Sequence, residues 1–315
     1  MDPVDVEQAQ TDVDGYFSGE TTREGFREAF GTTVDEVRIS LESGTFPNLP
    51  LADYLRVPLW SQSSLKEAAK SALHAKAARD ASVRTPPTDA MLLGSALHLA
   101  FLEPDKAEGR IVVWLGKARR GEAWADFQAK NKGKIILTND QYGRLAGMIH
   151  ALRDNFFVDK LARFGDMPVE VTKIGDVCGL KMKGRADALG EFTICDIKTV
   201  KSADPRKFLN ACIQFGYDVQ GAVYCELFDR DKFCLICVES DRPHDVVVFE
   251  LSQAMLDNGR RKMMGYIKTI LEAERTGIWP GRSSTPITLE SPSWDTEVDT
   301  EPTVERCEPP EEIDP

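Results

Sequence analysis

Three residues near the middle of the chain, Asp187, Asp196 and Lys198, have the types and spacing that metal-dependent hydrolysis of a phosphodiester requires. This reaction needs a hard cation that neutralises the phosphate and lowers the pKa of an attacking water, and Mg²⁺ binds mainly oxygen ligands such as carboxylates. The two aspartates would supply those oxygens. An ammonium group two residues after a metal-binding carboxylate can stabilise the charge that develops in the transition state, which is the role we predict for Lys198.

A predicted strand meander over residues 168–200 must position these side chains. Its three apolar and β-branched stretches are separated by turn-forming residues: Glu170–Ile174, Leu180–Leu189 and Phe192–Val200. Side chains alternate between the two faces of a strand, so Asp196 and Lys198 share one face, and Asp187 ends a neighbouring strand close to Asp196. Taken alone, an Asp-x-Lys pair is also typical of a solvated strand face with a weak ion pair.

A polar and aromatic stripe follows on a predicted helix over residues 205–228. Tyr217, Gln220 and Tyr224 are spaced by three and four residues, which places them on one helix face. The same spacing is found on half-exposed helices with ordinary surface tyrosines. Both interpretations remain open on periodicity alone.

The motifs occur in a characteristic order: Gly94-x-x-x-His98, Glu170, Asp187, Asp196-x-Lys198 and Gln220-x-x-x-Tyr224. This order resembles the PD-(D/E)XK nuclease superfamily, in the branch that holds RecB-type nuclease domains and lambda-type exonucleases. Strings such as Gly184-Arg185-Ala186-Asp187 are most similar to the exonuclease VIII-like family of phages and bacteria. The resemblance covers about residues 46–275. It implies an α/β fold of the restriction-endonuclease type, with a mixed central sheet flanked by helices and a helical N-terminal elaboration.

The resemblance also implies a metal site. His98, Asp187, Asp196 and the backbone carbonyl of Ile197 would bind Mg²⁺, with Mn²⁺ as a substitute, and Glu170 would bind or orient a metal through water. Asp196 stands where glutamate is commoner, and its shorter side chain can still bind a metal. Without the resemblance, a histidine in an apolar run is more typical of a protein core or interface than of a metal ligand.

The same resemblance implies contacts to DNA. Gln220 and Tyr224 would either touch the DNA or hold the lysine and the phosphate in place. Arg185, next to a metal-binding aspartate, would bind phosphate. Tyr217 belongs to the same predicted DNA-binding set.

The seven cysteines do not predict a metal cluster. Cys234-x-x-Cys237 has the spacing of half a zinc or iron–sulfur site, but on a predicted strand over residues 232–240 the odd spacing sends the two thiols to opposite faces. Related iron–sulfur nucleases need a cysteine upstream of the metal motifs, and here the first is Cys178. No iron–sulfur cluster is therefore expected. The sequence shows no secretory signal and no long apolar span, so we expect a cytoplasmic protein without a membrane partner, bacterial or phage-encoded.

The net charge of −12 is unevenly distributed along the chain. Residues 1–45 carry −8 and residues 283–315 carry −9, so the region between them carries +5. Its basic clusters, such as residues 117–120 and 130–134, could follow a phosphate backbone, although each is also typical of a solvated surface. We predict an acidic, mostly flexible segment at 1–45, a nuclease domain at 46–282 and a disordered acidic tail at 283–315.

Residue chemistry alone supports metal-dependent phosphodiester hydrolysis. The resemblance further implies a Mg²⁺-dependent exodeoxyribonuclease that digests double-stranded DNA ends in the 5′→3′ direction and leaves 3′ single-stranded tails for annealing recombination. It also implies a ring-shaped homo-oligomer and a single-strand annealing protein as partner. Two alternatives remain: a structure-selective endonuclease of the same superfamily, and a non-catalytic DNA-binding or scaffold protein.

Overall fold

The computed structural model describes residues 43–47, 49–81, 86–158 and 167–291. Residues 1–42 of the acidic segment predicted at 1–45, and residues 292–315 of the tail predicted at 283–315, lie outside the described residues. The chain divides into a unit that ends at Gly281 and a second unit that begins at Arg282. No helix of the described residues is both long enough and apolar enough to cross a bilayer.

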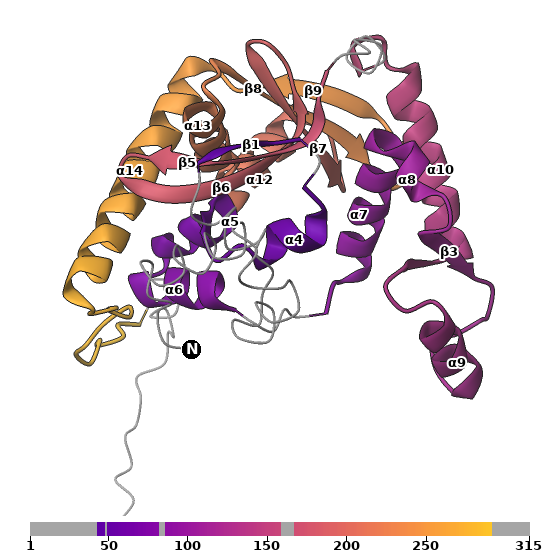
Figure 1. Ribbon diagram of the computed structural model, residues 1–315, viewed down its shortest axis with the longest axis horizontal. Helices are drawn as coiled ribbons and strands as arrows, with labels where there is room; N and C mark the ends of the chain where they lie inside the picture. The colour runs from indigo at the N-terminus through magenta and orange to yellow at the C-terminus, as the bar shows by residue number, and fades with distance from the viewer. Residues whose placement is uncertain (1–42, 48, 82–85, 159–166, 292–315) are drawn as a thin grey trace, which may run out of the picture. The chain divides into compact units, whose positions relative to one another are not determined.

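A mixed seven-stranded sheet forms the centre of the first unit (Figure 1). Its strands are β1 (Gly44–Phe46), β2 (Trp60–Ser61), β5 (Val169–Val177), β6 (Leu180–Leu189), β7 (Thr193–Val200), β8 (Lys232–Glu239) and β9 (Val246–Glu250). The order is β1-β5-β6-β7-β8-β9, with β2 added against β6. The pairs β7–β8 and β2–β6 are parallel and the others antiparallel. The predicted meander over 168–200 and the mixed sheet are confirmed.

Helices cover both faces of this sheet. They are α4 (Leu51–Arg56), α5 (Gln62–Leu65), η1 (Lys66–Ala69), α6 (Ala72–Asp80), α7 (Asp89–Leu102), α8 (Pro104–Ala107), α10 (Asn139–Asp154), α12 (Pro205–Phe215), α13 (Tyr217–Phe228) and α14 (Gln253–Thr276). One buried core lies between the sheet and α12, α13 and α14, and a second lies between the sheet and α7 and α10. Cys237 belongs to the first core and Cys234 to the second, which confirms that β8 points these thiols to opposite faces. The restriction-endonuclease-like α/β arrangement is thus the one predicted.

Two predicted helices are interrupted. The helix predicted over residues 205–228 is two helices, because Gly216 adopts a left-handed conformation (φ 71°) that ends α12 and begins α13. Glycine reaches this conformation without the steric cost of a side chain. Likewise, the helix predicted over residues 61–79 is divided into α5, η1 and α6, with Ser71 capping the last of them. In both cases the apolar periodicity continues across the break and conceals it.

A small projection was only partly predicted. Strands β3 (Ile111–Trp114) and β4 (Ile135–Thr138) pair in parallel as a separate two-stranded sheet, and α9 (Glu122–Lys130) lies in the connection between them. Figure 1 shows α9 beyond β3, away from the central sheet. The sequence predicts the helix but not the strands, since four residues are too few to show a clear alternation.

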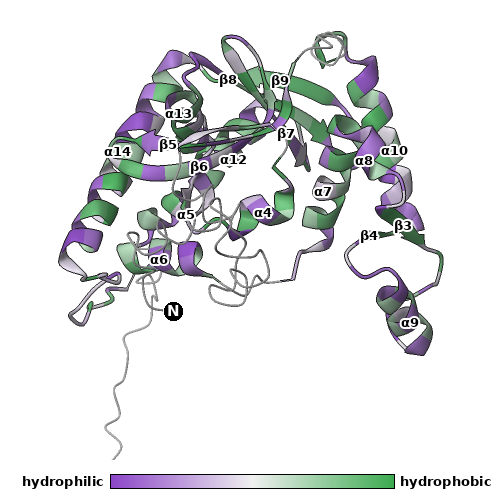
Figure 2. Ribbon diagram, viewed as in Figure 1, coloured by the Kyte–Doolittle hydropathy of each residue, from purple (hydrophilic) through white to green (hydrophobic). Residues whose placement is uncertain are grey.

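The contact between α13 and α14 depends on a glycine. A Cβ atom added to Gly259 would lie 2.1 Å from the carbonyl oxygen of Asp218, so the two helix backbones approach too closely for a side chain. The buried Asp218 carboxylate also accepts hydrogen bonds from Lys262 Nζ at 2.6 Å and Asn258 Nδ2 at 3.2 Å. Along α14, hydrophobic and hydrophilic positions alternate (Figure 2), as expected of a helix with one buried face. These contacts fix α13 against α14.

This close approach gives a prediction about stability. Gly259→Ala should lower the free energy of unfolding by about 1–3 kcal/mol, because the added methyl group collides with backbone. Gly265→Ala in the same helix has open space among the described residues and should raise the free energy by about 0.5–1 kcal/mol through helix propensity. Urea denaturation of both variants measures the difference. Equal changes in the two variants would contradict the packing described for α13 and α14.

Candidate metal centre

The predicted site residues gather where β6 and β7 separate. The ladder between the two strands ends with the pair Ala188–Cys195, and the next residues in this register are Asp187 and Asp196. Beyond this pair, the Asp187 side chain takes the place of a backbone acceptor on β6. Its Oδ2 accepts a hydrogen bond from the Ile197 backbone N–H at 2.7 Å. Both carboxylates are buried. The separation of the strands therefore creates a polar site inside the sheet.

Three potential ligands from three elements converge at this point. His98 of α7, Glu170 of β5 and Asp187 of β6 offer ligand atoms that all lie within 4.8 Å of one another. His98 Nδ1 lies 3.4 Å from Asp187 Oδ1 and 3.9 Å from Glu170 Oε1, and its Nε2 lies 3.0 Å from the carbonyl oxygen of Ile197. Two carboxylates, a carbonyl and an imidazole fit the donor preferences of a divalent cation.

Asp196 lies beside this group but is held by other partners. Its Oδ1 accepts a hydrogen bond from Gln220 Nε2 at 2.6 Å, and its Oδ2 forms an ion pair with Lys198 Nζ at 2.6 Å. A carboxylate oxygen can accept more than one partner, so Oδ2 could bind a cation while it keeps its contact with Lys198. The three-ligand group thus contains Glu170, the weaker of the predicted metal-binding carboxylates, whereas Asp196 connects the group to the lysine.

Burial and charge pairing act against each other in this site. Burial by itself disfavours the charged form of His98, but the charge and hydrogen bond of Asp187 outweigh it and raise the pKa of His98 well above 6.5. For Lys198, burial is likewise outweighed by the charges of Asp196 and Asp187, and its pKa is raised. The pKa of Asp196 is raised by burial, whereas that of Asp187 is lowered, because His98 and Lys198 overcome its burial. Because a metal is bound by the neutral imidazole, protonation of His98 competes with a cation at this site.

The site remains open to solvent at two side chains. His98 keeps 29% of its side-chain surface exposed and Lys198 keeps 23%. The Lys198 ammonium also lies 5.0 Å from the centre of the Tyr217 ring. A substrate phosphate would consequently reach the lysine and the histidine before the buried carboxylates.

Gln220, Tyr224 and Arg185 support the site from inside the protein. Gln220 and Tyr224 are 6% and 8% exposed, and the Tyr224 hydroxyl donates to the Arg185 carbonyl at 3.1 Å. The Arg185 guanidinium donates to the Glu170 carboxylate and, at 2.7 Å, to the Leu49 carbonyl. Of the two roles expected for Gln220 and Tyr224, this geometry favours holding the site together. Contacts of Arg185 and Tyr217 with DNA remain predictions.

The backbone of Glu170 is also unusual, with φ 53°. This left-handed conformation costs a residue with a side chain roughly 1–2 kcal/mol, which other contacts must offset. The ion pair with Arg185 is the contact that holds the Glu170 side chain. The same carboxylate lies 3.9 Å from His98 Nδ1.

One supporting segment was not predicted. The stretch around α4 accepts hydrogen bonds from side chains of β6: Arg185 donates to Leu49, and the buried Lys183 donates to the carbonyls of Tyr54 and Val57. Backbone carbonyls carry no residue-type signal, so no sequence pattern could have identified these partners. They fix the strand that carries Asp187.

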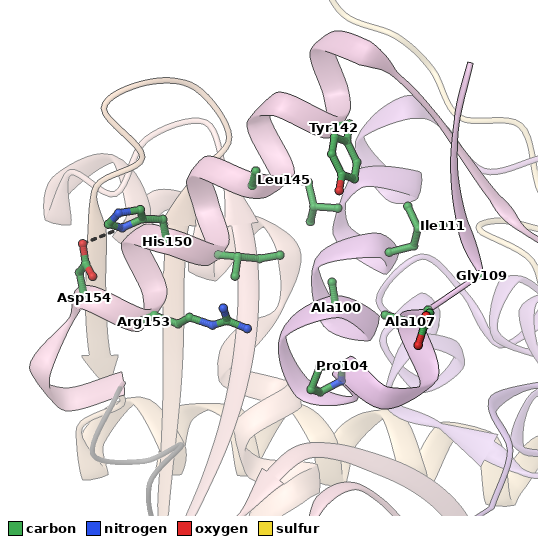
Figure 3. A pocket seen from close by; sticks show the side chains of 13 residues that line it. Ala100, Pro104, Ala107, Gly109, Ile111, Tyr142, Leu145, His150, Arg153 and Asp154 are labelled. Atoms are coloured by element: carbon green, nitrogen blue, oxygen red, sulfur yellow. Dashed lines mark ion pairs between the residues drawn. The ribbon is translucent and has the colours of Figure 1, made fainter. Parts of the chain in front are cut away.

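A separate cleft of about 720 Å³ lies between α7, α8 and α10 (Figure 3). Its lining includes Ala100, Tyr142, Leu145 and His150 but none of the predicted site residues. Ala100 follows His98 by two residues, which is about 200° around the helix, so the cleft opens on the far side of α7. The candidate metal centre is identified by its chemistry rather than by the size of a cavity.

The ligand geometry predicts how metal binding depends on Asp187. In Asp187→Asn the side chain still accepts the Ile197 hydrogen bond but loses its charge, so the affinity for Mn²⁺ should fall at least about 10-fold while folding is retained. Isothermal titration calorimetry measures the affinity and circular dichroism checks the fold. Asp140→Asn, at an exposed position on α10, is the matched control and should bind as the wild type does. Wild-type affinity in Asp187→Asn would rule out this centre.

Comparison with known proteins agrees with the predicted fold and superfamily. Residues 61–287 match a family described as a PDDEXK-like domain of unknown function (DUF3799). The structure is similar to that of a candidate exonuclease from Eubacterium rectale, with a TM-score of 0.55 and 17% identity over 78% of this chain and 96% of that chain. An alkaline exonuclease from Laribacter hongkongensis aligns with a TM-score of only 0.27 and 13% identity over 58% of this chain and 90% of that chain. No curated protein matches the chain. Because the family match covers most of the sequence, the chain belongs to this PDDEXK-like family, which confirms the superfamily that the order of its motifs predicts.

Proposed function

We propose that the protein is a Mg²⁺-dependent exodeoxyribonuclease that digests double-stranded DNA from its 5′ ends. Membership of the PDDEXK-like family supports a nuclease. The observation that carries the proposal is the convergence of His98, Glu170 and Asp187 within 4.8 Å, next to the ion pair of Asp196 and Lys198.

Each side chain has a task in this proposal. His98, Glu170 and Asp187 would hold the cation, with Asp196 Oδ2 and the Ile197 carbonyl as further oxygens. A bound Mg²⁺, or Mn²⁺ in its place, supplies charge neutralisation of the phosphate and lowers the pKa of a water.

The remaining side chains act on the substrate or keep the site in place. Lys198, which the neighbouring carboxylates keep charged, would stabilise negative charge on the phosphate as it is attacked. Gln220 keeps the Asp196 carboxylate oriented toward the lysine.

The finer parts of the proposal come from family resemblance. The motif order, most similar to exonuclease VIII-like enzymes, supports digestion from 5′ ends and a 3′ single-stranded tail for annealing recombination. The Eubacterium rectale protein, which shares the fold, is itself named as a candidate exonuclease. A single-strand annealing protein would then be the natural consumer of that tail.

The nuclease proposal is tested on linear and covalently closed DNA. The wild type with Mg²⁺ should release label from the 5′ end of a linear duplex, leave closed circles intact, and stop when EDTA is added. Lys198→Ala should reduce the rate at least about 100-fold, as removal of one transition-state interaction does, while duplex binding in Ca²⁺ persists. Lys232→Ala, at an exposed position outside the site, is the control and should keep the wild-type rate.

Each result decides one element of the proposal. Cutting of closed circles would replace the exonuclease with a structure-selective endonuclease. Absence of cutting on both substrates would leave a DNA-binding or scaffold protein. Release of a 3′ label before a 5′ label would reverse the polarity. A full rate in Lys198→Ala would remove the lysine from the mechanism.

The ring-shaped homo-oligomer is a separate prediction. If the protein encircles its duplex, its mass in solution should be a fixed multiple of the 35.0 kDa chain. Light scattering coupled to size-exclusion chromatography measures this mass. A monomer at all protein concentrations would eliminate the ring without affecting the metal centre.

A further inference from the structure

We propose that the segment from β3 through α9 to β4, residues 111–138, is an arm that grips double-stranded DNA beside the metal centre. We call it the β3–β4 arm. The proposal rests on the proposed function in one respect, namely that duplex DNA is the substrate. It concerns a part of the chain that contributes no ligand to the metal centre.

The arm has a small aromatic core of its own. The rings of Trp114, Trp124 and Phe127 lie with their centroids 5.1 to 6.4 Å apart, and all three residues are half-buried. Aromatic contacts of this kind stabilise beyond the area they bury. The core holds α9 against the end of β3 and gives the arm a defined surface.

Arg119 attaches the arm to the body of the protein. Its guanidinium donates to Asp89 Oδ1 at 2.5 Å, to Gln141 Oε1 at 2.6 Å and to the Ile136 carbonyl at 3.3 Å. Asp89 begins α7, and Gln141 lies in the first turn of α10. One side chain therefore connects the arm to two helices, so we expect the arm to keep its place relative to α7.

The exposed surface of the arm is basic on balance, with five cationic residues against the two acidic residues Glu122 and Asp126 of α9. Five exposed cationic residues lie between Leu115 and β4: Lys117, Arg120, Lys130, Lys132 and Lys134. None of them forms an ion pair within the described part of the chain. In a chain with a net charge of −12, such a cluster of cations is suited to a polyanion. Phosphates of a duplex would release counterions when these groups bind them.

The point where Arg119 attaches the arm to α7 lies close to the metal centre along this helix. Asp89, which Arg119 contacts, precedes His98 by nine residues of the same helix, or about 13.5 Å along its axis. This length corresponds to about four base pairs of duplex DNA at about 3.4 Å each. DNA that lies along α7 with a phosphate at the metal centre would therefore pass the attachment point of the arm within half a helical turn. The arm could hold the uncut duplex while the end is digested.

The charge of the arm favours duplex DNA over a protein that would bind the arm through apolar contacts. The aromatic rings pack on one another, and Leu115 is the single large apolar side chain exposed among the described residues of the arm, which is too little for an apolar protein interface. An acidic protein is the alternative that the test must exclude.

The test compares two triple variants that lose the same charge. The first is Lys130→Gln, Lys132→Gln and Lys134→Gln on the arm. The control is Lys232→Gln, Arg261→Gln and Lys268→Gln, which are exposed positions on β8 and α14. Fluorescence anisotropy measures binding of the full chain to a duplex, in EDTA and in Ca²⁺, over a range of salt concentrations. Binding to a poly-glutamate peptide is measured in parallel, and thermal melts check the fold.

The expected result is specific to the arm. Its variant should bind the duplex at least about 10-fold more weakly, and the slope of log affinity against log salt should become shallower by about 0.9 for each phosphate that the variant no longer neutralises. The control should stay within about twofold of the wild type. Wild-type affinity and slope in the arm variant would overturn the proposal, as would equal decreases in both variants or a decrease confined to poly-glutamate.

These outcomes also separate the arm from the proposed function. A wild type that binds duplex DNA through the arm but does not cut it would refute the nuclease and retain the arm. If the wild type and the arm variant cut linear duplexes at the same rate and bind them with the same affinity, the nuclease is retained and the arm is refuted. A wild type that binds no duplex would refute both.

Discussion

The hydrogen bond from the Ile197 backbone to the Asp187 carboxylate is the interaction on which the candidate site depends. It stands where the β6–β7 ladder stops, so one side chain both satisfies a buried strand N–H and turns a carboxylate into the gap. Buried charges are costly unless they are paired. The separation of two strands thus requires the cationic partners His98 and Lys198 that surround it.

Two helices enclose the strand separation, and each is fixed by packing at a distance from it. Helix α7 brings His98 to the Ile197 carbonyl, and α13 brings Gln220 to Asp196. Helix α13 can take this position because the left-handed Gly216 separates it from α12 and because it packs closely against α14 beside Gly259. The geometry of the site therefore depends on contacts that have no chemical role themselves.

Negative and positive charges lie in different parts of the protein. The terminal segments of the sequence carry a net negative charge and the metal centre holds buried carboxylates, whereas the β3–β4 arm exposes five cations. A buried anionic centre attracts a cation but repels the phosphate backbone of its substrate. Basic groups nearby would offset that repulsion, which gives a physical reason for placing them on an element close to α7.

The sequence by itself determined what depends on local periodicity and on motif order. It predicted β5 to β9, the shared face of Asp196 and Lys198, and the superfamily, because strand alternation and residue order are properties of the chain alone. Only the tertiary structure decided that Glu170 joins His98 and Asp187, whereas Asp196 is held by Lys198 and Gln220. That choice depends on where β6 and β7 separate and on helices packed from elsewhere, such as α13, whose Gln220 holds Asp196 from 24 residues further along the chain. No local pattern encodes a contact at that distance.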